Sequence, residues 1–240
     1  MILNSPLVSD KIEYVLTDIE GTTTSISFVY DVLFPYFLEH IWNLRDMTGI
    51  AEVENAFAET KAIVLKEDCI ELKSTEEIIE KLNQWCKEDR KITPLKTLQG
   101  LLWKIGYEQG VLKGHVYDDV PIALDKWYRM GLKMGVFSSG SVEAQKLIFG
   151  FSEKGDLRSF FSNYFDTQTG MKRETETYQK ISNILNVAPT KILFLSDIIE
   201  ELGAADKVGF QTIQLVRPGT VLNWKRAVRD FLEIELHEVI

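Results

Sequence analysis

The chain has 240 residues, 45% of them hydrophobic, which is enough for one large or two small domains with a full core. Its formal net charge of -9, with no basic run to offset it, argues against a nucleic-acid or anionic-membrane partner held by bulk electrostatics. Cys69 and Cys86 form no C-x-x-C pair or metal-binding spacing, and no stretch has signal-peptide or membrane-spanning character. We therefore expect an intracellular, soluble protein with reduced thiols.

The first predicted strand covers residues 14–17, together with Ile12, and it reads as buried on both faces of a sheet. Directly after it come Asp18, Glu20 and Gly21. Ligands of an open parallel sheet bind beyond the carboxyl ends of the strands, so both carboxylates would face that crevice. Two acids aimed at one point repel each other unless a cation lies between them or one is protonated. The alternative is that they simply end the strand and open a turn.

Residues 28–44 predict a helix with one buried face. Its apolar stripe consists of Leu33, Phe34, Phe37, Leu38, Ile41 and Trp42. Pro35 either lies in the first turn of this helix or kinks it. Residues 51–65 continue the helical pattern, and Cys86 is expected in the core because it follows Trp85 on an apolar helix face.

Two helix starts follow. Ser74 with Glu77 three residues later is a capping-box signature, and Thr93 before Pro94 is typical of a first helical turn. Residues 30–114 therefore predict a purely helical insert.

From residue 115 onward, strand and helix signals alternate, which is typical of a parallel α/β sheet. Strands are predicted at residues 133–137, 163–165, 191–195 and 210–216, and helices at 120–130, 142–149, 175–185 and 200–208. The first strand needs these partners. We therefore expect a discontinuous α/β core, residues 1–29 and 115–240, interrupted by the helical domain of residues 30–114.

Three predicted strands end in short polar side chains, which would meet at one edge of the sheet: Asp18 with Glu20, Ser138 with Ser139, and Asp197. One serine among residues 138–141 is expected to cap the next helix, which leaves two hydroxyls beside a helix start suited to an anion. Asp197 is either another capping acid or the third carboxylate of a metal site. Oxygen ligands favour a hard dication, and we expect Mg²⁺.

Lys172 lies in a loop that follows one of the short strands, at residues 170–173. A loop lysine is more often solvated than functional, and that is the alternative here. Beside three acids and an anion site, Lys172 would instead offset the charge of Asp18 and of a bound phosphate.

These motifs resemble those of a known superfamily. D-I-E-G-T-T, S-S-G-S, the lysine loop and S-D-I-I-E-E are similar to the four motifs of the haloacid dehalogenase superfamily. More narrowly, the segments D-I-E-G-T-T-T-S-I-S-F-V, L-F-P-Y, G-M-K-R-E-T-E-T-Y and V-R-P-G resemble the enolase-phosphatases of methionine salvage, also called acireductone synthases. The likeness spans residues 14–36 and most of residues 98–219, whereas the helical insert is matched weakly.

The resemblance implies a Rossmann-like parallel sheet core of the haloacid dehalogenase type with an inserted all-helical cap. It further implies that one Mg²⁺ is held by Asp18, Glu20 and Asp197. The substrate would be contacted by Ser138, Ser139 and Lys172.

The resemblance implies that Asp18 is the nucleophile that forms an aspartyl-phosphate and that Glu20 is the general acid and base. The longer side chain of Glu20 leaves open whether it meets the metal directly or through its backbone. Glu201 falls where many relatives carry a second acid, which implies a supporting role. The implied substrate is 2,3-diketo-5-methylthiopentyl 1-phosphate, which is enolised and then dephosphorylated to an acireductone.

Other functions stay open from the residues alone. The first is a phosphatase of another small phosphomonoester, or a phosphotransferase, because the core chemistry is shared and the cap selects the substrate. The second is a non-catalytic binding module, although such a module would be expected to have lost a nucleophile or metal acid. A dehalogenase is disfavoured because Glu20 supplies the acid that an ester leaving group needs. We expect a cytoplasmic monomer, with nuclear presence left open, that binds a small-molecule phosphate and neither nucleic acid nor membrane.

Overall fold

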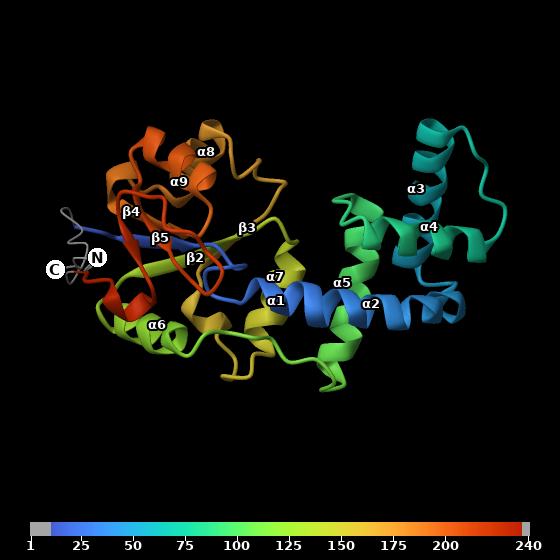
Figure 1. Cartoon of the computed structure of the whole chain (residues 1–240), viewed down its shortest axis with the longest axis horizontal. Helices are drawn as coiled ribbons and strands as arrows, with labels where there is room; N and C mark the ends of the chain where they lie inside the picture. The colour runs from blue at the N-terminus through green and yellow to red at the C-terminus, as the bar shows by residue number, and fades with distance from the viewer. Residues whose placement is uncertain (1–10, 237–240) are drawn as a thin grey trace. The chain divides into compact units, whose positions relative to one another are not determined.

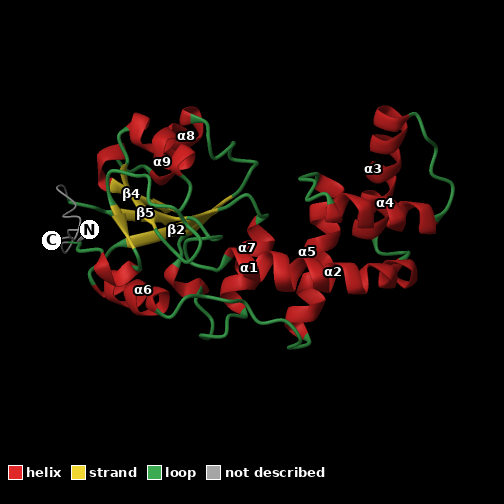
Figure 2. Ribbon diagram, in the orientation of Figure 1, coloured by secondary structure: helices red, strands yellow, loops and turns green. Residues whose placement is uncertain are grey.

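The computed structural model describes residues 11–236, and the chain divides into two compact units (Figure 1). One unit consists of two segments, which end at Ile26 and begin again at Lys113, and the other unit is the intervening segment Ser27–Leu112. Figure 2 shows the strands gathered in the first unit, whereas the regular elements described in Ser27–Leu112 are all helical. The first is called unit 1 and the second unit 2.

Unit 1 is built on a parallel sheet, which confirms the predicted fold class. Its strands are β1 (Tyr14–Thr17), β2 (Lys133–Phe137), β3 (Asn163–Phe165), β4 (Ile192–Ser196), β5 (Gln211–Leu215) and β6 (Ala227–Val228), in the spatial order β3-β2-β1-β4-β5-β6. Thr17 at the end of β1 is in register with Val136 of β2 and Leu195 of β4. The register therefore brings the polar residues that follow these three strands to one edge. The sequence did not indicate β6, which has only two residues.

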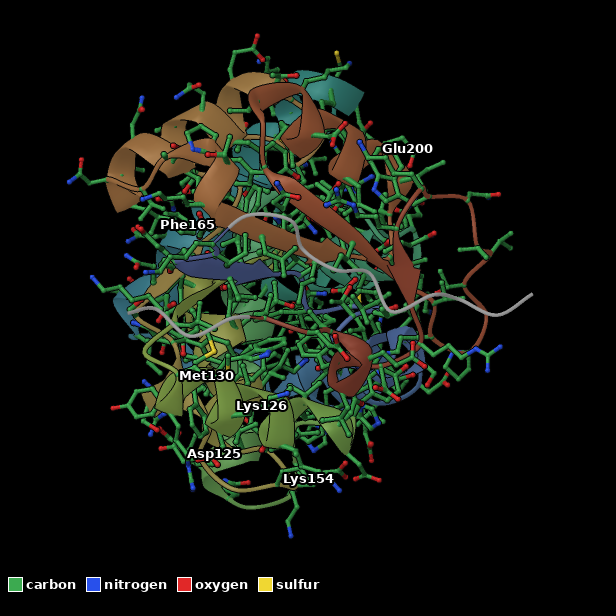
Figure 3. All side chains as sticks on the ribbon, turned by 90° about the vertical axis from the view of Figure 1, so that its left-hand side faces the viewer. Asp125, Lys126, Met130, Lys154, Phe165 and Glu200 are labelled. Atoms are coloured by element: carbon green, nitrogen blue, oxygen red, sulfur yellow. The ribbon has the colours of Figure 1, made fainter. Side chains whose placement is uncertain are left out.

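Helices cover both faces of this sheet. On one face, α8 (Thr175–Leu185) and α9 (Ile199–Val208) enclose a buried cluster that includes Tyr14, Tyr178 and Phe194. On the other face lies α6 (Asp119–Arg129), whose Trp127 stacks on Phe231 near the end of the described chain. Figure 3 shows Lys126 of α6 and Glu200 of α9 on opposite sides of the sheet. α7 (Val142–Gly150) follows β2.

Unit 2 has its own hydrophobic core. Its longer helices are α3 (Ala51–Asp68), α4 (Thr75–Lys87) and α5 (Thr93–Glu108), and they surround a cluster that contains Phe37, Leu44, Phe57, Leu82, Trp85 and Leu98. Cys86 is buried in this cluster, as predicted. The capping box of Ser74 and Glu77 is present at the start of α4, and α5 begins at Thr93 with Pro94 in its first turn, so both predicted helix starts are confirmed.

The helical prediction for residues 28–44 is confirmed, and of the two alternatives for Pro35 the structure shows the first, a position in the first turn of a helix. The segment consists of α1 (Ile26–Phe28), a π-helical turn (Val29–Leu33), α2 (Phe34–His40) and a 3-10 turn (Ile41–Met47). The proline ring at position 35 clashes with a regular preceding turn, and the wider turn, in which the Phe34 amide donates to the Val29 carbonyl, accommodates it. The tighter 3-10 turn then rotates the faces, so Trp42, expected in the core, is 36% exposed.

Within residues 11–236, the helices are too short or too polar to traverse a lipid bilayer.

Candidate active site

Asp18 stands at the tip of β1 and is buried. Its amide donates to the Leu195 carbonyl at 2.9 Å, which continues the ladder between β1 and β4 by one residue. Its Oδ1 accepts a hydrogen bond from the Ile19 amide at 2.7 Å. The strand backbone therefore fixes the position of this carboxylate before any ligand arrives.

The chain then turns tightly around the Ile19 carbonyl, which accepts hydrogen bonds from the amides of Thr22, Thr23 and Thr24. Gly21 has φ +70, and a Cβ built on it would collide with the carboxylate of Asp197. Glycine is needed here both for the left-handed backbone and for the close approach of that acid. The turn carries Glu20 to the same edge as the other acids.

Asp197 follows β4 and is buried. Burial, followed by the nearby charge of Asp18, raises the pKa of Asp197 to about 7. In the part of the chain that the structure describes, its Oδ1 has no hydrogen-bond partner. The alternative role of Asp197 as a helix cap is wrong. The N-cap position of α9 is occupied by Ile198, and the Ile198 amide donates to Ser196 Oγ.

Lys172 is only 7% exposed, so the alternative of a solvated loop lysine is wrong. Its Nζ lies 2.7 Å from Asp18 Oδ1 and 2.7 Å from Glu201 Oε2. Burial lowers the pKa of Lys172, but the two carboxylates outweigh this effect and the pKa is raised. Tyr178 holds the loop by donating to the Lys172 carbonyl at 2.7 Å. Lys172 is thus a fixed positive charge beside Asp18.

Glu201 comes from the first turn of α9 and forms the second ion pair of Lys172. Its Oε2 also accepts a hydrogen bond from Ser196 Oγ at 3.0 Å. Burial, with the charge of Asp18, raises the pKa of Glu201. The sequence indicated a supporting role for this acid, and the structure shows that its direct contact is to the lysine.

The serines after β2 have separate positions. Ser141 Oγ accepts from the Ala144 amide at 3.3 Å and caps α7, as predicted for one serine of this group. Ser138 is buried, and its Oγ accepts from the Gly140 amide at 3.2 Å, whereas Ser139 is exposed. Asp166 joins this group because its Oδ2 accepts from the Val142 amide at 3.3 Å. Substrate contact by Ser138 and Ser139 stays a prediction.

Asp18 and Asp197 together have the chemistry of a cation site. Among residues 11–236, no set of three or more acidic, histidine or cysteine side chains is gathered as a ready-made metal site. Asp197, however, has a buried oxygen without a hydrogen bond and a raised pKa beside Asp18, and a positive charge between them would relieve both effects. These two acids therefore fit a hard cation. A contact from Glu20 to such an ion stays a prediction.

Two buried side chains near this edge were missed by the sequence reasoning. Gln214 of β5 donates through Nε2 to the carbonyls of Asp197 and Val221, each at 3.0 Å. Arg217, just after β5, donates through Nε to the carbonyl of Thr22 at 2.9 Å. The V-R-P-G segment was the only signal for Arg217, and it did not indicate a contact.

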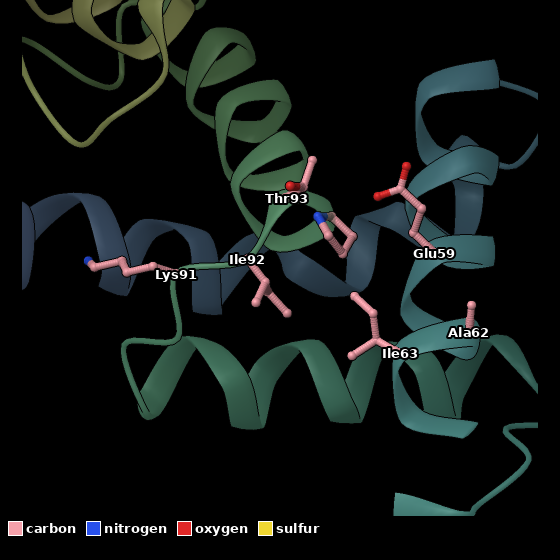
Figure 4. A pocket seen from close by; sticks show the side chains of 7 residues that line it. Glu59, Ala62, Ile63, Lys91, Ile92 and Thr93 are labelled. Carbon is pink, nitrogen blue, oxygen red and sulfur yellow. The ribbon is translucent and has the colours of Figure 1, made fainter. Parts of the chain in front are cut away.

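Unit 2 contains a hollow of about 440 Å³ that is separate from these residues. It is lined by Glu59, Ala62, Ile63, Lys91, Ile92, Thr93 and Pro94. Figure 4 shows the Lys91 side chain extended away from Glu59, so its charged groups do not converge on one point. The hollow therefore has no arrangement of reacting groups.

The haloacid dehalogenase-like hydrolase family matches residues 12–209. The chain is 47% identical to enolase-phosphatase E1 of Picosynechococcus sp., over 92% of this chain and 96% of that protein. It is 48% identical to enolase-phosphatase E1 of Pseudomonas aeruginosa, over 93% of this chain and 98% of that protein.

Solved structures give the same picture of the fold. The crystal structure of the UTR4 protein of Saccharomyces cerevisiae is similar with a TM-score of 0.77 and 33% identity, covering 92% of this chain and 98% of that one. A dehalogenase crystal structure is similar in fold, with a TM-score of 0.55 at 18% identity and with 93% and 96% of the two chains covered.

Proposed function

The chain belongs to the haloacid dehalogenase-like hydrolases and within them to the enolase-phosphatases, and we propose how its residues carry out the reaction. It is a phosphoric monoester hydrolase of methionine salvage. The substrate is 2,3-diketo-5-methylthiopentyl 1-phosphate, which is enolised and then hydrolysed to 1,2-dihydroxy-3-keto-5-methylthiopentene and phosphate. The observation that carries the proposed mechanism is the contact of Lys172 Nζ with Asp18 Oδ1 at 2.7 Å beside Asp197.

In the first phosphoryl-transfer step, a carboxylate oxygen of Asp18 attacks phosphorus, and the bond from phosphorus to the enol oxygen breaks. Glu20 gives its proton to the leaving oxygen. Lys172 offsets the charge of Asp18 and of the phosphate, because two anions would otherwise repel each other on approach. The hydroxyls of Ser138 and Ser139 donate to phosphate oxygens beside the start of α7, where the positive end of the helix dipole favours an anion.

In the second step, water attacks the phosphorus of the aspartyl-phosphate. Glu20, now ionised, takes a proton from that water, and the bond from phosphorus to the Asp18 oxygen breaks. Phosphate leaves, and both carboxyl groups return to their starting state. One group thus serves as acid and then as base, so Glu20 must keep the same position through both steps.

Asp18, Glu20 and Asp197 would hold one Mg²⁺. When bound, this ion supplies positive charge that withdraws electron density from the phosphate oxygens. Lys172 stays beside Asp18 and continues to offset its charge. The fit of Asp18 and Asp197 to a cation supports this part of the proposal.

Removal of Mg²⁺ by exhaustive chelation is expected to abolish turnover of the diketo phosphate, and added Mg²⁺ should restore it. A separate readout is the melting temperature, which Mg²⁺ should raise because it binds the folded state and relieves the repulsion between the acids. Asp197→Asn should lose this rise. The matched control is Asp125→Asn, which changes a half-buried acid of α6 that pairs with Arg129. Full turnover in the chelated wild-type protein would contradict the metal requirement.

We assign to unit 2 the role of a cap that selects the diketone and methylthio end of the substrate. The chain leaves and re-enters unit 1 at neighbouring points, because Thr24 Oγ1 donates to the His115 carbonyl at 2.8 Å and the Tyr117 amide donates to the Thr23 carbonyl at 3.0 Å. A short linker can therefore replace residues 27–112. Deletion of residues 40–95 alone is less suitable, since it would leave Phe37 and Leu98 of the unit 2 core without their partners.

The linker variant is expected to lose selectivity for the diketo phosphate and to keep a residual hydrolysis of a small aryl phosphate. The measurement is the ratio of kcat/KM for the two substrates, with the circular dichroism spectrum as the control for folding. A folded variant with unchanged selectivity would show that unit 1 alone recognises the substrate.

The protein is proposed to act as a cytoplasmic monomer on a small-molecule phosphate, without nucleic-acid or membrane partners. The net charge of -9 supports the absence of a polyanionic partner. Light scattering on the purified chain tests the oligomeric state, and a mass of about twice 27.5 kDa would contradict a monomer.

A further inference from the structure

Arg217 is a buried charge to which the mechanism above assigns no role. It follows β5 and is only 5% exposed. Its guanidinium forms a bidentate ion pair with Asp119 at the start of α6, with Nη1 2.9 Å from Oδ1 and Nη2 2.7 Å from Oδ2. A buried guanidinium that is held by such an ion pair also restrains the acceptors that its other N–H groups contact.

One remaining donor reaches the turn that carries Glu20. Arg217 Nε donates to the Thr22 carbonyl at 2.9 Å, two residues after Glu20. The other hydrogen bonds of this turn are mostly internal, because the Ile19 carbonyl receives three of its amides. An outside contact is therefore what sets the position of the turn relative to the sheet. Two more outside contacts hold the far end of the turn, the Tyr117 amide to the Thr23 carbonyl and Thr24 Oγ1 to the His115 carbonyl.

The guanidinium has little freedom to rotate. Its Nη1 also donates to the Arg229 carbonyl at 3.2 Å, and its central carbon lies 4.2 Å from the ring centroid of Tyr117 and 5.5 Å from that of Phe231. Asp119 is held as well, since its Oδ2 accepts from the Phe231 amide at 2.7 Å. With the plane of the group fixed on several sides, the direction of the Nε–H bond is fixed too.

We propose that Arg217 is a positioning residue that sets the place of Glu20 through the Thr22 carbonyl. The inference rests on the proposed roles of Asp18 and Glu20. Asp18 is anchored separately by the strand ladder, through its amide to the Leu195 carbonyl. Loss of the Arg217 contact therefore displaces the acid and base while it leaves the nucleophile in place.

An aryl phosphate with a good leaving group separates these two effects. In its first step Asp18 attacks phosphorus and the phenolate departs without needing a proton. In its second step water attacks the aspartyl-phosphate, and Glu20 must take the proton from the water. A displaced Glu20 slows only the second step, so phosphorylated enzyme accumulates and one equivalent of phenolate is released early.

The test uses the full chain with p-nitrophenyl phosphate and Mg²⁺. Arg217→Lys keeps the charge next to Asp119 but loses the Nε donor to Thr22. We expect kcat to fall about 10- to 100-fold, since small displacements of reacting groups cost this much. KM should fall with it, so that kcat/KM, which reports only the steps up to the phosphorylated enzyme, changes less than about threefold. The early burst of nitrophenolate should approach one equivalent per enzyme and exceed that of the wild type.

Two variants serve as comparisons. Asp119→Asn weakens the ion pair but keeps the Nε contact, so its kcat should fall less than about fivefold without an enlarged burst. Lys225→Ala removes an exposed ion pair with Asp206 in the same C-terminal region and should match the wild type. If Arg217→Lys does not fold, the double variant Arg217→Met with Asp119→Leu replaces it, because apolar replacement of both partners of a buried pair often preserves stability.

A normal kcat in the folded Arg217 variant would overturn the inference. A lower kcat with no enlarged burst would overturn it equally, because a general loss of structure slows both steps. Failure of the proposed function is seen separately, as absence of turnover and of phosphorylated enzyme in the wild-type protein.

Discussion

Asp18→Asn is expected to reduce turnover of the diketo phosphate and of a small aryl phosphate by on the order of 10⁴-fold or more. The amide keeps the shape of the carboxylate but has no anionic oxygen to attack phosphorus. No other described acid is held by the strand ladder at the tip of β1, so none can replace it without moving the backbone.

The fold should survive this change. Asp18→Asn removes one of the two ion pairs of Lys172, but the pair with Glu201 remains. The change also removes the charge that contributes to the raised pKa of Asp197 and of Glu201, so repulsion is relieved at the same time. The two effects oppose each other, and we expect a melting temperature within a few degrees of the wild type.

The measurements are kcat with both substrates and the melting temperature, with Asp125→Asn as the matched control on an acid of α6 outside the site. Phosphatase activity retained by Asp18→Asn would show that another group is the nucleophile.

Lys172→Ala is expected to lower kcat/KM by about 10³-fold, because it removes the fixed positive charge that lets an anionic nucleophile approach an anionic phosphate. Lys172 also contributes to stability, since its Nζ is buried and paired with both Asp18 and Glu201. Truncating one partner of a buried ionic group leaves the others uncompensated, so the free energy of unfolding should also fall, by about 3 kcal/mol.

Lys172→Met separates the two effects because it keeps much of the packing volume and removes only the charge. It should lose as much activity as the alanine variant. Lys180→Ala is the control, since this exposed lysine of α8 contacts the same loop through the Thr169 carbonyl at 3.0 Å. Normal kcat/KM in Lys172→Met, whatever its stability, would mean that the lysine is structural only.

The parallel sheet was predictable because each of its main strands is a short apolar run followed by a polar turn. Asp18 and Asp197 could be placed at one edge from this pattern alone, since parallel strands present their carboxyl ends together. The sequence also predicted that Lys172 would offset the charge of Asp18. It did not predict that Lys172 is buried. Burial depends on how the loop returns over the sheet, and here Tyr178 of α8 fixes that path.

Other features depend on contacts that no local pattern records. The π-helical turn before Pro35 accommodates the proline ring. The sequence predicted only that Pro35 lies in a first helical turn or kinks the helix, and it did not predict a π-helical turn. Trp42 is exposed because the 3-10 turn that begins at Ile41 changes the direction of the side chains that follow. The Arg217 contact joins residues 195 positions apart, so only the folded chain reveals it.

The most direct test of the account is to incubate the purified chain with Mg²⁺ and 2,3-diketo-5-methylthiopentyl 1-phosphate and to follow phosphate release and the absorbance of the enediol product together. We predict that both appear in equal amounts, that kcat/KM exceeds that for other small phosphomonoesters, and that Asp18→Asn abolishes phosphate release. Phosphate release without the enediol, or faster hydrolysis of an unrelated phosphomonoester, would contradict the account.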